Sequence, residues 1–238
     1  MFIVGLDLSI NYSSYTVLDC DKGDYYFGSI VNDASMSKKK ISFLTDLSET
    51  KNNMDVYFTS SAGNKTSVHQ LDYLNCERMK LINYIEIATL LCKAINKITG
   101  KSENVIVGLE GFSYGSQGMA VFDVPMLTGI IRYKILENVV NFDSNRIFVF
   151  PPSDLKKEFG CKGNCDKGVI FKEFIANPKT DSMKSSDFYK FIVENQNDKS
   201  VSNVSSSNKL IIESPFNDII DSYLSVYKIL KNIDLKAK

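Results

Sequence analysis

Four carboxylates stand at positions where a folded chain seldom places charge. Asp7 lies inside the apolar run FIVGLDL, and Glu110 ends a second such run, VIVGLE. Asp218 and Asp221 are three residues apart near the start of the last segment with apolar residues at helical spacing, so both lie on one face of a helix. Because acidic side chains are rarely buried without a partner, these positions point to a chemical role.

Each of these acids also has an ordinary structural explanation. Asp218, in the first turn of a helix, would be favoured by the helix dipole, and Asp221 could face solvent. Asp7 could hydrogen-bond a turn after its strand, and Glu110 could pair with a lysine at the sheet edge. A shared site is favoured only when all four acids are considered together. Such a site requires the first and fourth strands to be neighbours and the last helix to pack across them.

Converging carboxylates would need a cation, because like charges a few ångström apart cannot all stay ionised without compensation. Magnesium binds a few carboxylates together with water and phosphate oxygens. Two such ions about 3.5–4 Å apart can activate a water and stabilise the leaving oxygen of a phosphodiester. We therefore predict two Mg²⁺ ions per active site, replaceable by Mn²⁺. Asp7 would bridge the two ions, and Glu110, Asp218 and Asp221 would complete their ligands.

The elements that must position these acids follow an α/β pattern. Three strands, Phe2–Leu8, Ser14–Leu18 and Tyr25–Val31, are expected to form an antiparallel meander. Asn104–Leu109 and Arg146–Phe150 would complete a five-stranded sheet. Helices are expected at 68–98, 116–140, 153–159, 166–176, 185–195 and 214–233. The order predicts a mixed sheet flanked by helices, in a single domain spanning residues 1–238.

Two stretches of the chain lack this regular pattern, and the first is interpreted as an insertion. Residues 32–66 hold many Ser, Asn and Lys residues, and one short strand is expected near Ile41–Leu44. The second is the Ser- and Asn-rich stretch 196–209, which is expected to be a mobile loop.

Composition limits the classes of function. The chain has 238 residues, and its 28 Lys and Arg balance 28 Asp and Glu. Zero net charge argues against a surface that is basic throughout, so DNA binding would need a local patch such as the lysine-rich segment 154–190. No stretch has the length of a membrane span, and no signal peptide is apparent, so a cytoplasmic protein is expected. The five cysteines lack the spacing of a disulfide framework and are expected to be reduced.

Four motifs resemble, in order, those of RuvC-type Holliday-junction resolvases. They are GLDLS at 5–9, LEGFS at 109–113, the run from PSDLKK at 152–157 through GCKGNCDK at 160–167, and NDIIDS at 217–222. The resemblance covers most of the chain outside two regions that depart from the family pattern, residues 32–66 and 176–213, which are the two insertions. It implies a ribonuclease-H-like fold and a homodimer in which two magnesium ions per site cut four-way DNA junctions symmetrically.

The resemblance also implies roles for individual residues. The four acids match the metal-binding catalytic acids of the family. Lysines of the third motif would position the DNA backbone without reading bases, and loop aromatics after Glu110 would stack near the junction centre. The residues implied in DNA binding are Phe112, Tyr114, Lys156, Lys157, Lys162 and Lys167.

The two insertions lengthen the chain beyond the compact bacterial enzymes, in the manner of phage-encoded relatives, and so leave dimer geometry and sequence preference open. Two other functions also remain open. GLDLS resembles the first phosphate loop of actin-like sugar or acyl-phosphate kinases, although a second glycine-rich adenosine motif is missing. A non-catalytic protein that binds branched DNA is the other alternative.

Overall fold

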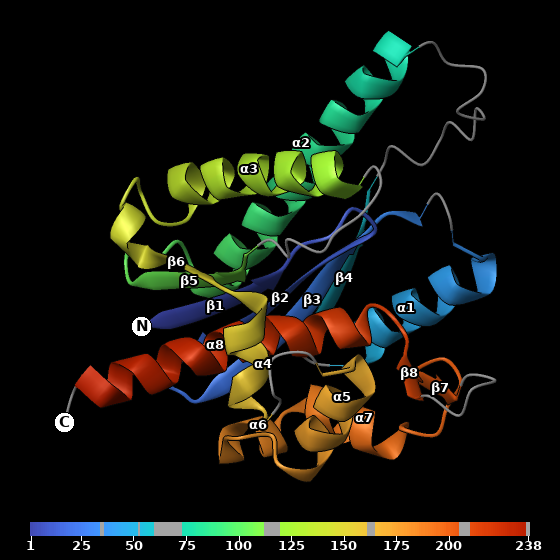
Figure 1. Cartoon of the computed structure of the whole chain (residues 1–238), viewed down its shortest axis with the longest axis vertical. Coiled ribbons are helices and arrows are strands. Elements are labelled where there is room, and N and C mark those ends of the chain that lie inside the picture. Colours follow the sequence, from blue (N-terminus) through green and yellow to red (C-terminus); the bar gives the residue numbers. More distant parts are fainter. Residues whose placement is uncertain are drawn as a thin grey trace.

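A six-stranded mixed sheet forms the centre of the computed structural model (Figure 1). The structure describes residues 1–33, 36–51, 53–59, 73–111, 120–160, 165–204 and 210–236. The strands lie in the order β4-β3-β2-β1-β5-β6, with bounds Met54–Phe58, Asp24–Val31, Tyr12–Asp19, Phe2–Asp7, Val105–Glu110 and Ile147–Phe150. The predicted mixed α/β class and the β1-β2-β3 meander are confirmed, and the sheet has one strand more than the five expected.

The parallel pair β1 and β5 carries two of the candidate acids to one edge. Gly5 is in register with Gly108, and Leu6 with Leu109. Each strand continues by one residue, to Asp7 and Glu110 respectively, which therefore end side by side. Carboxyl ends of neighbouring parallel strands are where open α/β sheets place their functional groups.

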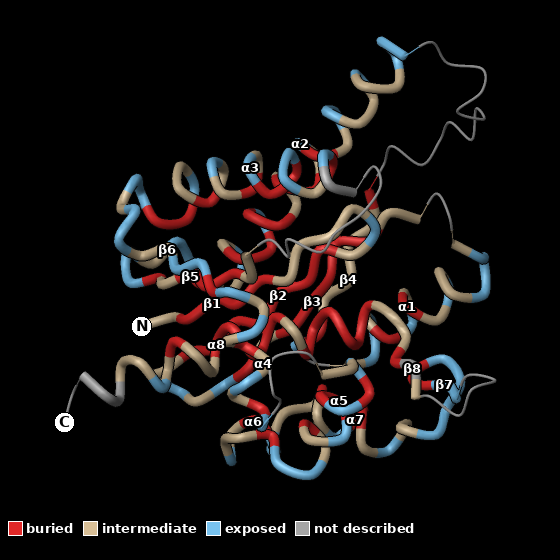
Figure 2. The backbone as a smooth tube through the Cα atoms, in the orientation of Figure 1, coloured by how far each residue is buried: buried red, intermediate tan, exposed pale blue. Residues whose placement is uncertain are grey.

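Helices cover both faces of the sheet, and the inner strands between them are largely buried (Figures 1 and 2). One face is covered by α2 (Tyr73–Thr99) and α3 (Ala120–Asn138), against which Val4 and Leu6 pack. The other is covered by α8 (Phe216–Lys236), against which Ile3 packs. Because side chains alternate along a strand, Asp7 follows Ile3 on the α8 side.

Small residues let α8 lie directly on the sheet. A Cβ atom added at Gly5 would lie 2.0 Å from the backbone oxygen of Ser222, and one at Gly108 would lie 2.7 Å from the Ile229 Cδ1. The hydroxyls of Ser222 and Thr16 are 2.7 Å apart and join α8 to β2. This close approach sets the height of α8, and therefore of its acids, above the strand ends.

In its described residues, the first insertion contains a helix and a strand, and the short strand predicted near Ile41–Leu44 is wrong because this segment belongs to the helix. Helix α1 (Lys38–Thr50) begins after Ser37, whose side chain accepts a hydrogen bond from the Lys40 backbone N–H. Leu44 and Leu47 are buried at helical spacing, which the polar composition of the segment concealed. Strand β4 then pairs in parallel with β3 and supplies the sixth strand.

The second insertion packs on the sheet rather than forming a long loop. It contains α6 (Asp181–Ser185), α7 (Asp187–Glu194), β7 (Ser202–Val204) and β8 (Leu210–Ile212). The rings of Phe188 and Phe27 stack with centroids 4.7 Å apart, which anchors α7 to β3. The prediction of a mobile loop at 196–209 is wrong for β7, which pairs with β8, and 205–209 lie outside the described residues.

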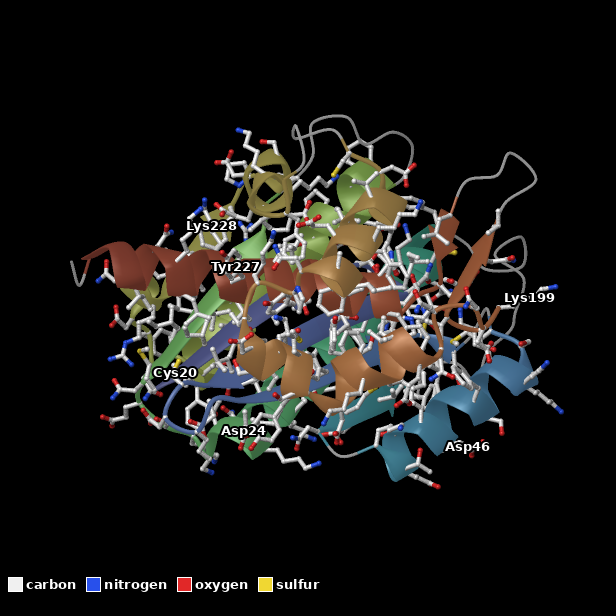
Figure 3. The ribbon with its side chains drawn as sticks, turned by 90° about the horizontal axis from the view of Figure 1, so that it is seen from below. Cys20, Asp24, Asp46, Lys199, Tyr227 and Lys228 are labelled. Atoms are coloured by element: carbon white, nitrogen blue, oxygen red, sulfur yellow. The ribbon has the colours of Figure 1, made fainter. Side chains whose placement is uncertain are left out.

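The remaining helices lie on either side of β6 in the sequence, before the second insertion. They are the 3-10 helix Ser144–Arg146, α4 (Pro152–Glu158) and α5 (Lys167–Ala176). Glu158 accepts hydrogen bonds from Lys228 at 2.5 Å and Lys231 at 2.6 Å, and Figure 3 shows Lys228 on α8 beside α4. This pair of contacts ties α4, with its lysines, to α8.

Membrane spans and the state of the cysteines were the two expectations about the whole chain. No helix in the described part of the chain is both long enough and apolar enough to cross a membrane. Cys20, Cys76 and Cys92 form no disulfide bond, as expected. Cys165 is disulfide-bonded, which corrects the expectation that all five cysteines are reduced.

Candidate metal centre

Asp7, Asp218 and Asp221, with Glu110 at the edge, form an acidic pocket. Asp7 and Glu110 come from the ends of β1 and β5, and the other two come from the first turns of α8. One carboxylate oxygen from each of the three aspartates lies within 4.8 Å of the others. Asp218 and Asp221 are buried or nearly so, with side chains 9% and 12% exposed. Residues more than 200 positions apart in the sequence thus meet at one point because α8 crosses β1 at Gly5.

Burial and mutual repulsion disfavour negative charge in this pocket. Burial raises the pKa of Asp7 well above its usual range, and the charges of Asp221, Asp218 and Glu110 raise it further. The pKa values of Asp218 and Asp221 are also raised by burial, although the charge of Lys167 opposes the shift at both. Without more positive charge, the pocket cannot hold all of its carboxylates ionised.

Glu110 stands slightly apart from the three aspartates. It ends β5 beside Asp7, and burial together with the charge of Asp221 raises its pKa to about 7. The charges of Lys156 and Lys167 oppose this rise. The charge of Asp221 therefore acts on Glu110, although Glu110 is not among the three aspartates whose oxygens lie within 4.8 Å of one another.

Lys167 is the cation nearest the aspartates among the described residues. It is the first residue of α5, whose N-cap Asp166 accepts a hydrogen bond from the Gly168 backbone N–H at 2.8 Å. Its Nζ lies 3.5 Å from Asp218 Oδ1 and 3.4 Å from Asp221 Oδ2. Burial alone would lower the pKa of Lys167, but the charges of Asp221, Asp218 and Asp7 outweigh it and raise the pKa to about 12.

The pocket fits a divalent cation better than it fits Lys167 alone. Asp218 Oδ2 is buried and has no hydrogen-bond partner among the described residues. A buried charged oxygen without a partner is costly, and a metal ion is one of the few groups that would satisfy it. The donors are all carboxylate oxygens, which are the ligands of hard ions such as Mg²⁺ and Mn²⁺.

The other predicted DNA-binding residues are placed as follows. Lys156, on α4, is half-buried, and its charge lowers the pKa of both Glu110 and Asp221, so it lies at the pocket. Lys157 is exposed and makes an ion pair of 3.1 Å with Asp154 on the same helix. The calls on Phe112, Tyr114 and Lys162 fall outside the described residues.

The role of one lysine and of two glycines in forming the acidic pocket was missed from the sequence. Lys167 was assigned to DNA, yet it contacts the acids themselves, because α5 packs beside α8. Gly5 and Gly108, which admit α8, were not singled out. Their signal was present in the repeated tripeptides Gly-Leu-Asp and Gly-Leu-Glu at the ends of two strands.

Comparison with known proteins gives similarity in structure only. No protein-family model and no curated protein matches this chain. RuvC from Thermus thermophilus is 11% identical over 97% of each chain, with a TM-score of 0.48. The Fowlpox virus resolvase, solved with Holliday junction DNA, is 13% identical over 98% of this chain and 99% of its own, with a TM-score of 0.38. The yeast mitochondrial Holliday junction resolvase Ydc2 is 11% identical over 94% of this chain and 75% of its own, with a TM-score of 0.43.

This chain is similar to RuvC-type resolvases. The similarity concerns how helices and strands are arranged, since the identities lie far below the level at which residues can be equated. Roles for individual side chains therefore rest on the acidic pocket and on the four sequence motifs.

Proposed function

We propose that this protein is a divalent-metal-dependent endonuclease that cuts branched DNA, with four-way junctions as its main substrate. The observation that carries the proposal is the convergence of Asp7, Asp218 and Asp221, including a buried Asp218 oxygen that no described residue satisfies. The choice of branched DNA follows from the four motifs that resemble RuvC-type resolvases.

In this proposal the chain supplies the ligands and the orientation. Asp7, Asp218 and Asp221 would hold Mg²⁺, with Glu110 as a further ligand from the end of β5. Two ions, when bound, supply charge stabilisation and an activated water for phosphodiester hydrolysis. Lys156 and Lys167 lie where they can hold a phosphate of the DNA backbone beside the acids. Burial of the acids keeps their geometry fixed, which the reaction requires.

We propose further that the active form is a homodimer, because symmetric cutting of a four-way junction needs two sites. Exposed apolar side chains on α2 and α3 support a contact between two copies. They are Tyr73, Leu74, Phe122 and Tyr133, which are 82%, 76%, 76% and 55% exposed. Light scattering coupled to gel filtration should give twice the chain mass of 26.8 kDa, and a monomer at micromolar concentration would contradict the proposal.

Cleavage of synthetic DNA tests the proposed activity. Asp7→Asn preserves the size of the side chain while removing the charge at the centre of the pocket. It should reduce Mg²⁺-dependent cutting of a four-way junction by about a thousandfold or more, and leave junction binding in EDTA within about twofold. Asp181→Asn is the control, because Asp181 is fully exposed on α6, and it should cut like the wild type. Metal-independent binding without cutting by the wild type would favour the non-catalytic alternative.

A further inference from the structure

Lys167 reaches the acidic pocket from a helix on its open side. Its side chain is 53% exposed, whereas the Asp218 and Asp221 side chains that its Nζ contacts are 9% and 12% exposed. The two Nζ to oxygen distances, 3.5 and 3.4 Å, are longer than the roughly 2.8 Å of a strong charge-assisted hydrogen bond. The ammonium is therefore held at the mouth of the pocket by charge, and not by tight hydrogen bonds.

One ammonium does not satisfy three aspartates. Asp218 offers its Oδ1 to Lys167, while its Oδ2 stays buried without a partner among the described residues. The oxygens that Lys167 contacts belong to the same carboxylates that could hold a metal ion. Lys167 and a metal ion would therefore compete for Asp218 and Asp221.

We propose that Lys167 is a displaceable cation, which occupies the mouth of the acidic pocket without metal and moves to a DNA phosphate when metal enters. The inference rests on the proposed function. Beyond that function, it proposes that the Lys167 side chain couples metal binding to DNA binding.

Electrostatics makes simultaneous occupation unfavourable. An ammonium and a divalent ion a few ångström apart repel each other strongly in a partly buried site. The lysine side chain has rotatable bonds along its whole stem and is already half in solvent, so it can swing outward at little cost. Outside the pocket, its charge would lie in solvent beside the acids, where a DNA phosphate could contact it.

Metal binding without DNA tests the first half of the proposal. Titration calorimetry with Mn²⁺ alone, at fixed pH, would compare the wild type with Lys167→Met. Loss of two partly exposed ion pairs predicts that the variant binds Mn²⁺ about fivefold to thirtyfold more tightly. Lys184→Met is the matched control, because Lys184 is 52% exposed and pairs only with Asp181 among the contacts described, at 3.1 Å. Equal or weaker Mn²⁺ binding by Lys167→Met would overturn the exchange.

The salt dependence of junction binding tests the second half. Each phosphate contact adds about 0.9 to the slope of log affinity against log salt. In Ca²⁺, used to fill the pocket without turnover, the wild type should have a slope larger by about 1 than Lys167→Met. In EDTA the two slopes should agree. A difference of the same size in both conditions would mean that Lys167 binds DNA regardless of metal, and would overturn the coupling.

Failure of this inference is separable from failure of the proposed function. If the wild type cuts junctions with Mg²⁺ but Lys167→Met leaves Mn²⁺ affinity unchanged, only the exchange is refuted. If the wild type does not cut while the variant binds Mn²⁺ more tightly, the exchange stands and the nuclease proposal falls. Lys167→Gln repeats both measurements with a polar side chain, in case the methionine variant alters folding.

Discussion

Replacing Glu110 with glutamine should stabilise the metal-free protein at alkaline pH. Burial and the charge of Asp221 raise the pKa of Glu110 from 4.5 to about 7. Below pH 4.5 the carboxyl is protonated in both the folded and the unfolded chain, and it imposes no penalty. Between these values the folded protein holds a proton that the unfolded chain has released, so stability falls as pH rises through about 7.

The size of the effect follows from that pKa. Each pKa unit corresponds to about 1.4 kcal/mol, so ionised Glu110 costs the folded state about 3 kcal/mol. Solvent screening of a group that is not fully buried reduces this to about 2 kcal/mol. For a chain of this length, that difference corresponds to about 4–8 °C in Tm. Glutamine has the shape of the protonated acid and avoids the penalty.

Thermal unfolding in EDTA between pH 5 and pH 8.5 measures the difference. Wild type and Glu110→Gln should differ little at pH 5 and separate progressively as pH rises to about 7, with the variant more stable, and the difference should level off above pH 7. Saturating Mg²⁺ should reverse the order at pH 8, because the wild type keeps a ligand that the variant lacks.

Glu137→Gln is the control for removal of a carboxylate. Glu137 is half-buried on α3, and its hydrogen bond with Lys134 lowers its pKa, so its replacement should give no alkaline stabilisation. A Glu110→Gln variant that is less stable than wild type in EDTA at pH 8 would refute the reasoning, as would a difference that does not change with pH.

Two further predictions concern how the site is held. Gly5→Ala should destabilise the protein by about 3 kcal/mol in urea unfolding, because the added carbon meets the Ser222 backbone oxygen; Gly129→Ala, where no described atom lies within 4 Å, should be neutral or stabilising. If both alanines behave alike, close packing of α8 is not the cause. Phe188→Ala should cost about 3–5 kcal/mol by the same measurement, since Phe188 is 1% exposed and stacks on Phe27. A loss below about 1 kcal/mol would mean that the second insertion is not part of the core.

Local sequence was sufficient for the strands that carry the acids. The apolar runs ending at Asp7 and Glu110 are short, continuous and β-branched, and such runs form buried strands wherever the sheet is covered on both sides. Helical spacing likewise identified α8 and placed Asp218 and Asp221 on one face. These features depend on neighbours within a few residues, so the one-dimensional pattern determines them.

Tertiary structure decided what the pattern left open. Segment 38–50 is a helix because the burial of Leu44 and Leu47 in the core outweighs the polar composition of the segment. Strand β4 then pairs in parallel with β3 at the edge of the sheet. Lys167 faces the acids because α5 is seated where Gly168 approaches the Leu210 backbone, a contact between residues 42 positions apart. Which cation meets which carboxylate depends on such long-range packing, and no spacing within the sequence encodes it.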